Sequence, residues 1–166
     1  MGSDEKAAVP VVRLELKHVN LRQLVEMDEF LGTAPLFRAA GQEGTQRLID
    51  NAVPRRLAAG QAIFREGDAG NSLFLVLRGE VTLGHDAAVI ASVRKGDFFG
   101  EAEVLAPRSL RGCNATAADA ADVAEFPLAD IAAVVQKQVA VLALLRDARD
   151  ERAKANSELD DFLNRW

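Results

Sequence analysis

Gly96-Asp97-Phe98-Phe99-Gly100-Glu101 is the stretch from which the rest of this chain can be interpreted, together with Arg111 further along. A short helix beginning at Gly100 would present unpaired backbone N–H groups and the positive end of its dipole to an anion, and glycine has no side chain to keep that anion away. Arg111 would approach from the opposite side with a planar, permanently charged guanidinium. These groups together predict a phosphate site.

Glu101 adds a second requirement, because a carboxylate repels phosphate. It is useful in such a site only if it accepts a hydrogen bond from a neutral hydroxyl group. The nearest such group in a nucleotide is the ribose 2′-OH. The stretch therefore predicts a site for a phosphate that is bonded to a sugar.

From about residue 36 to residue 126 the chain resembles the cyclic nucleotide-binding domains, through matches that follow one another in order. Residues 59–68 are similar to the first turn and strand of that family, residues 72–81 to its central hairpin, and residues 96–101 to the start of its phosphate-binding cassette. The resemblance implies a mainly β fold with flanking helices: an eight-stranded antiparallel β-roll, jelly-roll-like, with N-terminal helices and a C-terminal helical lid.

The resemblance also implies which residues bind the ligand. Glu101 falls on the ribose-binding glutamate and Arg111 on the phosphate-binding arginine. Arg108 is the alternative for the arginine if the loop of residues 106–110 is shifted relative to the family. Leu83 and Ile90 fall where family members line the floor under the base. The implied ligand-binding residues are Phe99, Gly100, Glu101, Ala102, Arg111, Gly112, Cys113, Leu83 and Ile90. No metal and no cofactor other than the cyclic nucleotide are implied.

The chain departs from the family pattern directly after the arginine, where it has Gly112, Cys113 and Asn114, and at Glu103. A threonine directly after the arginine often helps family members to recognise the guanine of cGMP, and Gly112 offers no hydroxyl, so cAMP is favoured over cGMP. Glu103 stands where members usually have alanine or glycine beside the phosphate. A second negative charge there costs on the order of 1 kcal/mol if solvated and more if buried. We expect Glu103 to turn outward into water; the alternative is a pocket that has lost its nucleotide or changed its ligand.

Composition agrees with one domain and excludes some partners. The chain has 166 residues, 49% of them hydrophobic, and a net charge of −5, which suits one core and argues against a nucleic-acid partner. The single cysteine, Cys113, excludes an internal disulfide framework and favours a cytoplasmic location. The sequence shows no run of eighteen apolar residues and no leader pattern, so we expect no membrane anchor.

Before the strands, the pattern predicts a disordered tail over residues 1–10 and an N-terminal extension over residues 11–35, containing a strand at 12–17 and a helix from Asn20 to Leu31. The cyclic nucleotide-binding domain is expected over residues 36–138. Within it we expect a helix at about 42–49 and strands from about 53 to 126. A hairpin of residues 81–83 and 88–90, joined by Gly84-His85-Asp86, would form an apolar bed for a purine.

We expect one long helix of roughly 40 Å over residues 139–166. An apolar seam typical of coiled coils runs along it, interrupted only by Arg152: Val141, Leu145, Ala148, Ala155, Leu159, Phe162 and Trp166. One interpretation is a lid over the nucleotide that continues into a homodimer or partner contact. The other is that the first turns cover the barrel while the charged segment 146–154 is solvated and frays.

The sequence contains no arrangement of residues that is typical of an enzyme active site. His18 and His85 are expected to be isolated surface residues, which excludes a metal-binding cluster of imidazoles. Cys113 and Ser109 lack a nearby histidine base, and Glu101 and Glu103 should diverge from a helix start. We therefore expect a non-catalytic sensory module that binds cAMP and switches the position of its C-terminal helix. The alternative is a nucleotide-free scaffold that uses the same barrel for protein interaction or oligomerisation.

Overall fold

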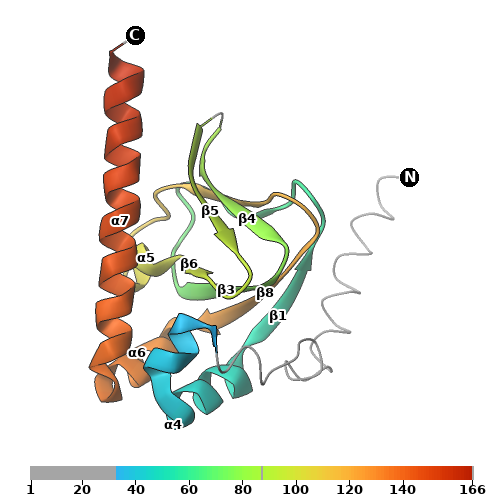
Figure 1. The fold of residues 1–166 in the computed structure, drawn as a ribbon, viewed down its shortest axis with the longest axis vertical. Helices are drawn as coiled ribbons and strands as arrows, with labels where there is room; N and C mark the ends of the chain where they lie inside the picture. Colours follow the sequence, from blue (N-terminus) through green and yellow to red (C-terminus); the bar gives the residue numbers. More distant parts are fainter. Residues whose placement is uncertain (1–32, 87, 166) are drawn as a thin grey trace.

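The structure, a computed structural model, describes residues 33–165 with the exception of residue 87. The tail at 1–10, the strand expected at 12–17, the helix expected from Asn20 to Leu31, and Trp166 lie outside the described residues. Figure 1 shows the described part as two sheets flanked by helices, with one long helix along the side.

The described residues form eight strands in two four-stranded sheets, and every strand pairing is antiparallel. One sheet has the order β1-β8-β3-β6 and the other β2-β7-β4-β5. This confirms the expected antiparallel β-roll, and the strand region as a whole, from Val53 to Pro127, begins and ends within a residue of the expected limits. The strands are β1 (Val53–Leu57), β2 (Ala62–Phe64), β3 (Ser72–Arg78), β4 (Glu80–His85), β5 (Ala88–Arg94), β6 (Phe98–Phe99), β7 (Asn114–Ala117) and β8 (Ala121–Pro127).

The hairpin of β4 and β5 is longer than expected, because Gly84 and His85 belong to β4 rather than to the turn. Leu83 pairs with Ala91, but Gly84 pairs with Val89, so the register shifts at Ile90. A Cβ on Gly84 would collide with the carbonyl oxygen of Ala88. Glycine therefore allows the two strands to approach closely where a larger residue would have ended the pairing.

Four helices are described: α4 (Pro35–Asn51), α5 (Glu101–Leu105), α6 (Leu128–Lys137) and α7 (Val139–Asn164). The helix expected at 42–49 lies within α4, which begins earlier because a first helical segment precedes a break at Gly41. Gly41 has φ 71°, a left-handed conformation that glycine adopts at little cost.

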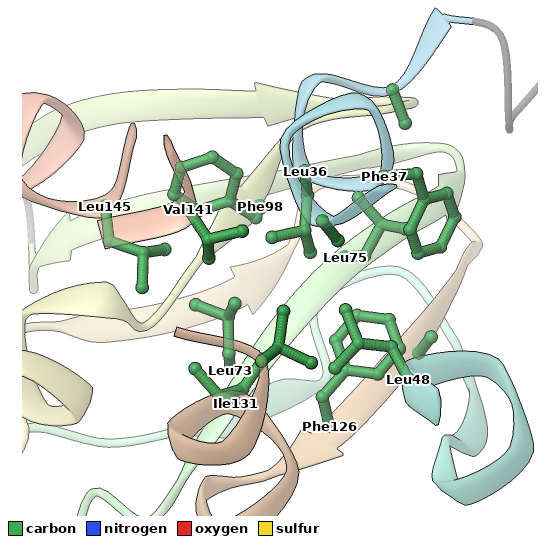
Figure 2. Close-up of a cluster of buried hydrophobic side chains, with 14 of the residues drawn as sticks. Leu36, Phe37, Leu48, Leu73, Leu75, Phe98, Phe126, Ile131, Val141 and Leu145 are labelled. Carbon is green, nitrogen blue, oxygen red and sulfur yellow. The ribbon is translucent and has the colours of Figure 1, made fainter. Parts of the chain in front are cut away.

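Strand β3 separates two hydrophobic clusters, because successive side chains point to opposite faces of a sheet. Phe74 and Val76 point between the sheets, where the rings of Phe74 and Phe99 stack with centroids 5.1 Å apart. The opposite face of the same sheet carries the helices. That cluster contains Leu36, Phe37 and Leu48 from α4, Leu73 and Leu75 from β3, Phe98 from β6, Phe126 from β8, Ile131 from α6, and Val141 and Leu145 from α7 (Figure 2).

The first half of the apolar seam on α7 is used by this domain itself. Val141 and Leu145 are buried in the helix-side cluster, and Ala148 packs against it. Segment 146–154 is helical, so the second interpretation, in which this segment frays, does not describe the structure. The C-terminal end of α7 projects past the sheets (Figure 1).

Within the described part of the chain, no single helix is long and apolar enough to cross a membrane. Helices α6 and α7 have the length and apolar composition of a membrane span only when they are taken together, and the chain bends by 120° between them.

Candidate functional site

The turn between β6 and α5 depends on Gly100. It is the N-cap residue of α5 and has φ 88°, in the left-handed region that favours glycine. A Cβ there would lie 2.9 Å from Nη1 of Arg111 and 3.3 Å from the carbonyl oxygen of Ser72. Glycine at this position is therefore needed both for the backbone conformation and for the close approach of the arginine.

Arg111 is buried, with 3% of its surface exposed. Its Nη1 donates to the carbonyl oxygen of Gly100 at 3.1 Å, and its Nη2 donates to that of Ser72 at 2.8 Å. Its guanidinium carbon lies 4.2 Å from the centroid of the Phe64 ring. Burial lowers the pKa of the guanidinium. Arg108, the alternative, is exposed, so Arg111 is the arginine that is built into the fold here.

One buried nitrogen of this arginine is not satisfied. Within residues 33–165, leaving out 87, Nε of Arg111 is the buried side-chain nitrogen or oxygen that has no hydrogen-bond partner. Such a group is costly unless something accepts its proton.

Glu103 does not turn into water, so that expectation is wrong. It is 6% exposed, and its Oε1 lies 3.6 Å from Nη1 of Arg111. A Cβ on Gly70 would lie 2.6 Å from Cγ of Glu103, so the absence of a side chain at residue 70 leaves the space that Glu103 fills. Burial raises the pKa of the Glu103 carboxyl, although Arg111 opposes this.

Glu101 is paired with a residue that the sequence did not predict. Its Oε2 lies 2.8 Å from Nη1 of Arg152 on α7, and Nη2 of Arg152 donates to the carbonyl oxygen of Phe98 at 2.8 Å. The available signal was the one charged residue in the apolar seam of the last helix. Arg152 does not merely interrupt the seam; it joins α7 to α5 and β6.

A cavity of about 390 Å³ lies between α5, the β4–β5 hairpin, the segment before β7, and α7. The expected residues Leu83, Ile90, Gly100, Glu101, Ala102, Gly112 and Cys113 line it. Phe99 and Arg111 do not. Phe99 stacks with Phe74 in the core, and Arg111 packs on Phe64. The lining residues that were not expected are Phe64, Glu103, Ala106, Ser109, Leu110, Arg149, Arg152, Ala153 and Asn156.

His85 is not the isolated surface residue that was expected. Its Nε2 lies 2.9 Å from Oδ1 of Asn156 on α7, and its Nδ1 lies 3.2 Å from Oε1 of Glu66. It therefore links the end of the β4–β5 hairpin to the helix that closes the cavity. Cys113 is half-buried just before β7 rather than inside a strand. Burial raises the pKa of its thiol to about 11, so it is a poor nucleophile at neutral pH.

Within the described residues, no group of three or more histidine, cysteine, aspartate or glutamate side chains could hold a metal ion. The chemistry that the cavity offers is instead hydrogen bonding. Two carboxylates lie close to two arginines, next to the apolar side chains of Leu83 and Ile90. Such a wall suits a ligand with a flat apolar part and a polar part.

The model of the cyclic nucleotide-binding domain family matches residues 54–138. The chain belongs to this family. Two kinds of curated protein are similar in sequence over part of their length. The cGMP-dependent protein kinase of Toxoplasma gondii is 35% identical over 100 residues, which cover 58% of this chain and 10% of the kinase. The cAMP-dependent protein kinase regulatory subunit of Yarrowia lipolytica is 30% identical over 110 residues, which cover 60% of this chain and 29% of the subunit.

This cyclic nucleotide-binding domain thus spans less than a third of the length of those curated relatives. Among solved structures, cAMP-bound PfPKA-R superposes with a TM-score of 0.71 at 20% identity, covering 80% of this chain and 45% of that one. At that level of identity the likeness is one of fold. It agrees with the two sheets and flanking helices described above.

Proposed function

We propose that this cyclic nucleotide-binding domain is a non-catalytic sensory module located in the cytoplasm. Its ligand is a cyclic purine nucleotide, cAMP in the first place, which enters the cavity and changes the position of α7. Its ribose would lie on Glu101, its purine over Leu83 and Ile90, and its phosphate towards Arg111. The observation that carries the proposal is the contact of Glu101 with Arg152, because the residue expected to hold the ribose also holds α7.

The coupling follows from the geometry of a carboxylate, which has two oxygens. Arg152 uses Oε2 of Glu101, and a ribose 2′-OH would donate to the other oxygen. Arg149, Arg152, Ala153 and Asn156 of α7 line the same cavity, so a ligand contacts the helix directly as well. A ligand shifts the position of a helix only by the difference in its affinity for the two positions, and these contacts supply that difference.

The ligand class is supported by the family and by named relatives. The Toxoplasma kinase is named for cGMP, and PfPKA-R has cAMP bound. Gly112 lines the cavity and has no hydroxyl to offer a guanine, which favours cAMP. For cAMP, the carboxylate of Glu103 must leave Arg111 or take up a proton, because two negative groups at one cation disfavour each other.

We propose that the C-terminal end of α7 passes the signal of ligand binding to another protein chain. There Phe162 and Leu163 are 58% and 55% exposed, beyond the part of the helix that packs on the domain. Exposed apolar pairs on a projecting helix suit contact with another helix. We propose that this end binds a second copy of the chain, with a different protein partner as the alternative.

One observation favours a second candidate. Glu103 already provides a negative group beside Arg111, which is what a nucleotide-free scaffold would need to keep its fold without a phosphate. In that case the barrel would serve protein interaction or oligomerisation alone.

The test of the proposed function is thermal unfolding of the whole chain with and without cAMP, cGMP, adenosine and guanosine, combined with hydrogen exchange of α7. Ligand at one hundred times Kd should add about 2.7 kcal/mol to the unfolding free energy and slow exchange over residues 149–156. Unchanged melting and exchange with every one of these ligands at millimolar concentration would support the scaffold instead.

A further inference from the structure

We infer that the cavity, with Glu103 in the position described, selects an uncharged purine ribonucleoside with free 3′- and 5′-hydroxyl groups over a cyclic nucleotide. Glu101 and Glu103 would both accept hydrogen bonds from the ribose. The inference rests on the proposed function in one respect, that the same cavity accepts a purine riboside, and it replaces cAMP by a nucleoside as the preferred ligand.

The positive charges around the cavity are already balanced by carboxylates. Arg149 and Arg152 line the cavity, and Arg111 pairs with Glu103, which also lines it. Each of the three arginines already has a negative partner: Arg111 has Glu103 at 3.6 Å, Arg152 has Glu101 at 2.8 Å, and Arg149 has Asp150 at 3.0 Å. Both terminal nitrogens of Arg111 also donate to backbone carbonyls. A phosphate therefore has to displace Glu103 from its cation, whereas an uncharged ligand leaves every one of these pairs intact.

The carboxylates of Glu101 and Glu103 favour a ligand with several hydroxyl groups. An ionised carboxylate accepts hydrogen bonds and donates none, and an O–H donor to a charged oxygen makes one of the stronger hydrogen bonds. A ribonucleoside has three hydroxyl donors. In a 3′,5′-cyclic nucleotide two of those oxygens are esterified, so only the 2′-OH can donate, and the diester adds a negative charge. The cyclic ligand thus loses donors where Glu103 offers an acceptor.

Arg111 supports the same ligand. Its buried Nε has no hydrogen-bond partner and needs an acceptor. Arg111 does not line the cavity itself, so a ligand would reach it past Glu103. A hydroxyl group accepts as well as donates, so one nucleoside hydroxyl placed between the two side chains would accept from Arg111 and donate to Glu103. A phosphate oxygen can satisfy only the arginine.

The position of Glu103 is built into the fold rather than accidental. The carboxylate is 6% exposed, and its stem occupies the space left by Gly70. The cavity, at about 390 Å³, falls within the range of about 300–1,000 Å³ that is usual for small-molecule pockets. Its apolar wall of Phe64, Leu83 and Ile90 leaves room for a purine.

The experiment is titration calorimetry of the full chain with adenosine and guanosine and with the matching cyclic nucleotides, cAMP and cGMP. The wild type should bind a nucleoside at least about tenfold more tightly than its cyclic partner, since an unmatched buried acceptor and a repelled charge both count against the latter. Glu103→Ala should reverse that order. Glu103→Gln keeps the shape and removes the charge, and it serves if the alanine variant does not fold.

Deoxynucleosides locate the contacts. 3′-Deoxyadenosine or 5′-deoxyadenosine should bind the wild type at least about tenfold more weakly than adenosine, and that difference should shrink in Glu103→Ala. 2′-Deoxyadenosine tests Glu101 instead.

The outcomes separate the two proposals. If wild-type protein binds cAMP as tightly as adenosine, the inference is overturned while the proposed function stands. If nucleosides bind but neither Glu103 variant changes the order, the role given to Glu103 is overturned. If no purine riboside binds the wild type or either variant, the inference and the proposed function fail together.

Discussion

Arg111 ties together parts of the chain that are far apart in sequence, because its side chain donates to the carbonyl oxygens of Gly100 and Ser72 and neutralises Glu103. Its removal should therefore damage the fold as well as ligand binding. Arg111→Ala leaves Glu103 buried without its cation, and we expect a loss of about 3–5 kcal/mol in unfolding free energy, measured by urea denaturation followed by circular dichroism.

The double variant Arg111→Ala, Glu103→Ala is the control. It removes both members of the pair, so no buried charge is left alone, and it should lose less stability than Arg111→Ala. Equal losses in the two proteins would mean that the buried pair contributes little and that the backbone hydrogen bonds of Arg111 are what matters.

Glu103 should make both stability and ligand choice depend on pH. It is faced by Arg111, by Glu101 on its own helix, and by the segment holding Gly112 and Cys113; burial raises the pKa of its carboxyl above the ordinary 4.5, and Arg111 only partly opposes this. The folded protein then holds a proton that the unfolded chain has released. Its contribution to stability is thus present below the ordinary pKa and lost as pH rises through the raised one.

In the same window, which extends upward from 4.5, protonation of Glu103 removes a negative charge and replaces a charged acceptor oxygen by an O–H donor. Affinity for cAMP should rise as pH falls, and affinity for adenosine should fall. Calorimetry across a pH series measures both slopes, and Glu103→Gln should flatten the difference between them. Parallel slopes for the two ligands in wild-type protein would contradict the role given to this carboxyl.

Part of the site could be predicted from the sequence. The approach of Arg111 to Gly100 and the position of Glu101 on the cavity were expected, because these residues lie within one short segment. The direction of Glu103 could not, since it depends on the space beside Gly70, in a different loop. Arg152 was visible only as a charged residue in an apolar seam, and its partner Glu101 lies far from it in sequence.

One side chain of α7, that of Arg152, reaches both α5 and β6. Arg152→Ala should speed hydrogen exchange over residues 149–156 and abolish the protection that a ligand adds there, because Glu101 would no longer transmit ligand binding to the helix. Arg149→Ala is the matched control: it lines the same cavity from the same helix but pairs with Asp150. Identical behaviour of the two variants would show that Arg152 has no special part in the coupling.

The elements show where periodicity is informative and where it is not. The resemblance to the family implied the β-roll, whereas β3 is buried on both of its faces and shows no alternation of buried and exposed residues. The seam on α7 predicted an apolar helix face but not its partner, because the same spacing serves a coiled coil and a helix packed on its own domain. Val141 and Leu145 proved to belong to the domain core.

For the whole molecule, the remaining question is what the projecting end of α7 contacts. Phe162 and Leu163 are exposed and lie outside both hydrophobic clusters, so replacing them should not disturb the fold. Phe162→Ser with Leu163→Ser should therefore convert a self-associating chain into a monomer with unchanged unfolding free energy and ligand affinity, measured by analytical ultracentrifugation over a concentration series. Val139→Ser is the control, because Val139 is 77% exposed at the opposite end of the same helix and should leave association unchanged. A wild-type chain that stays monomeric throughout the series would reject the homodimer.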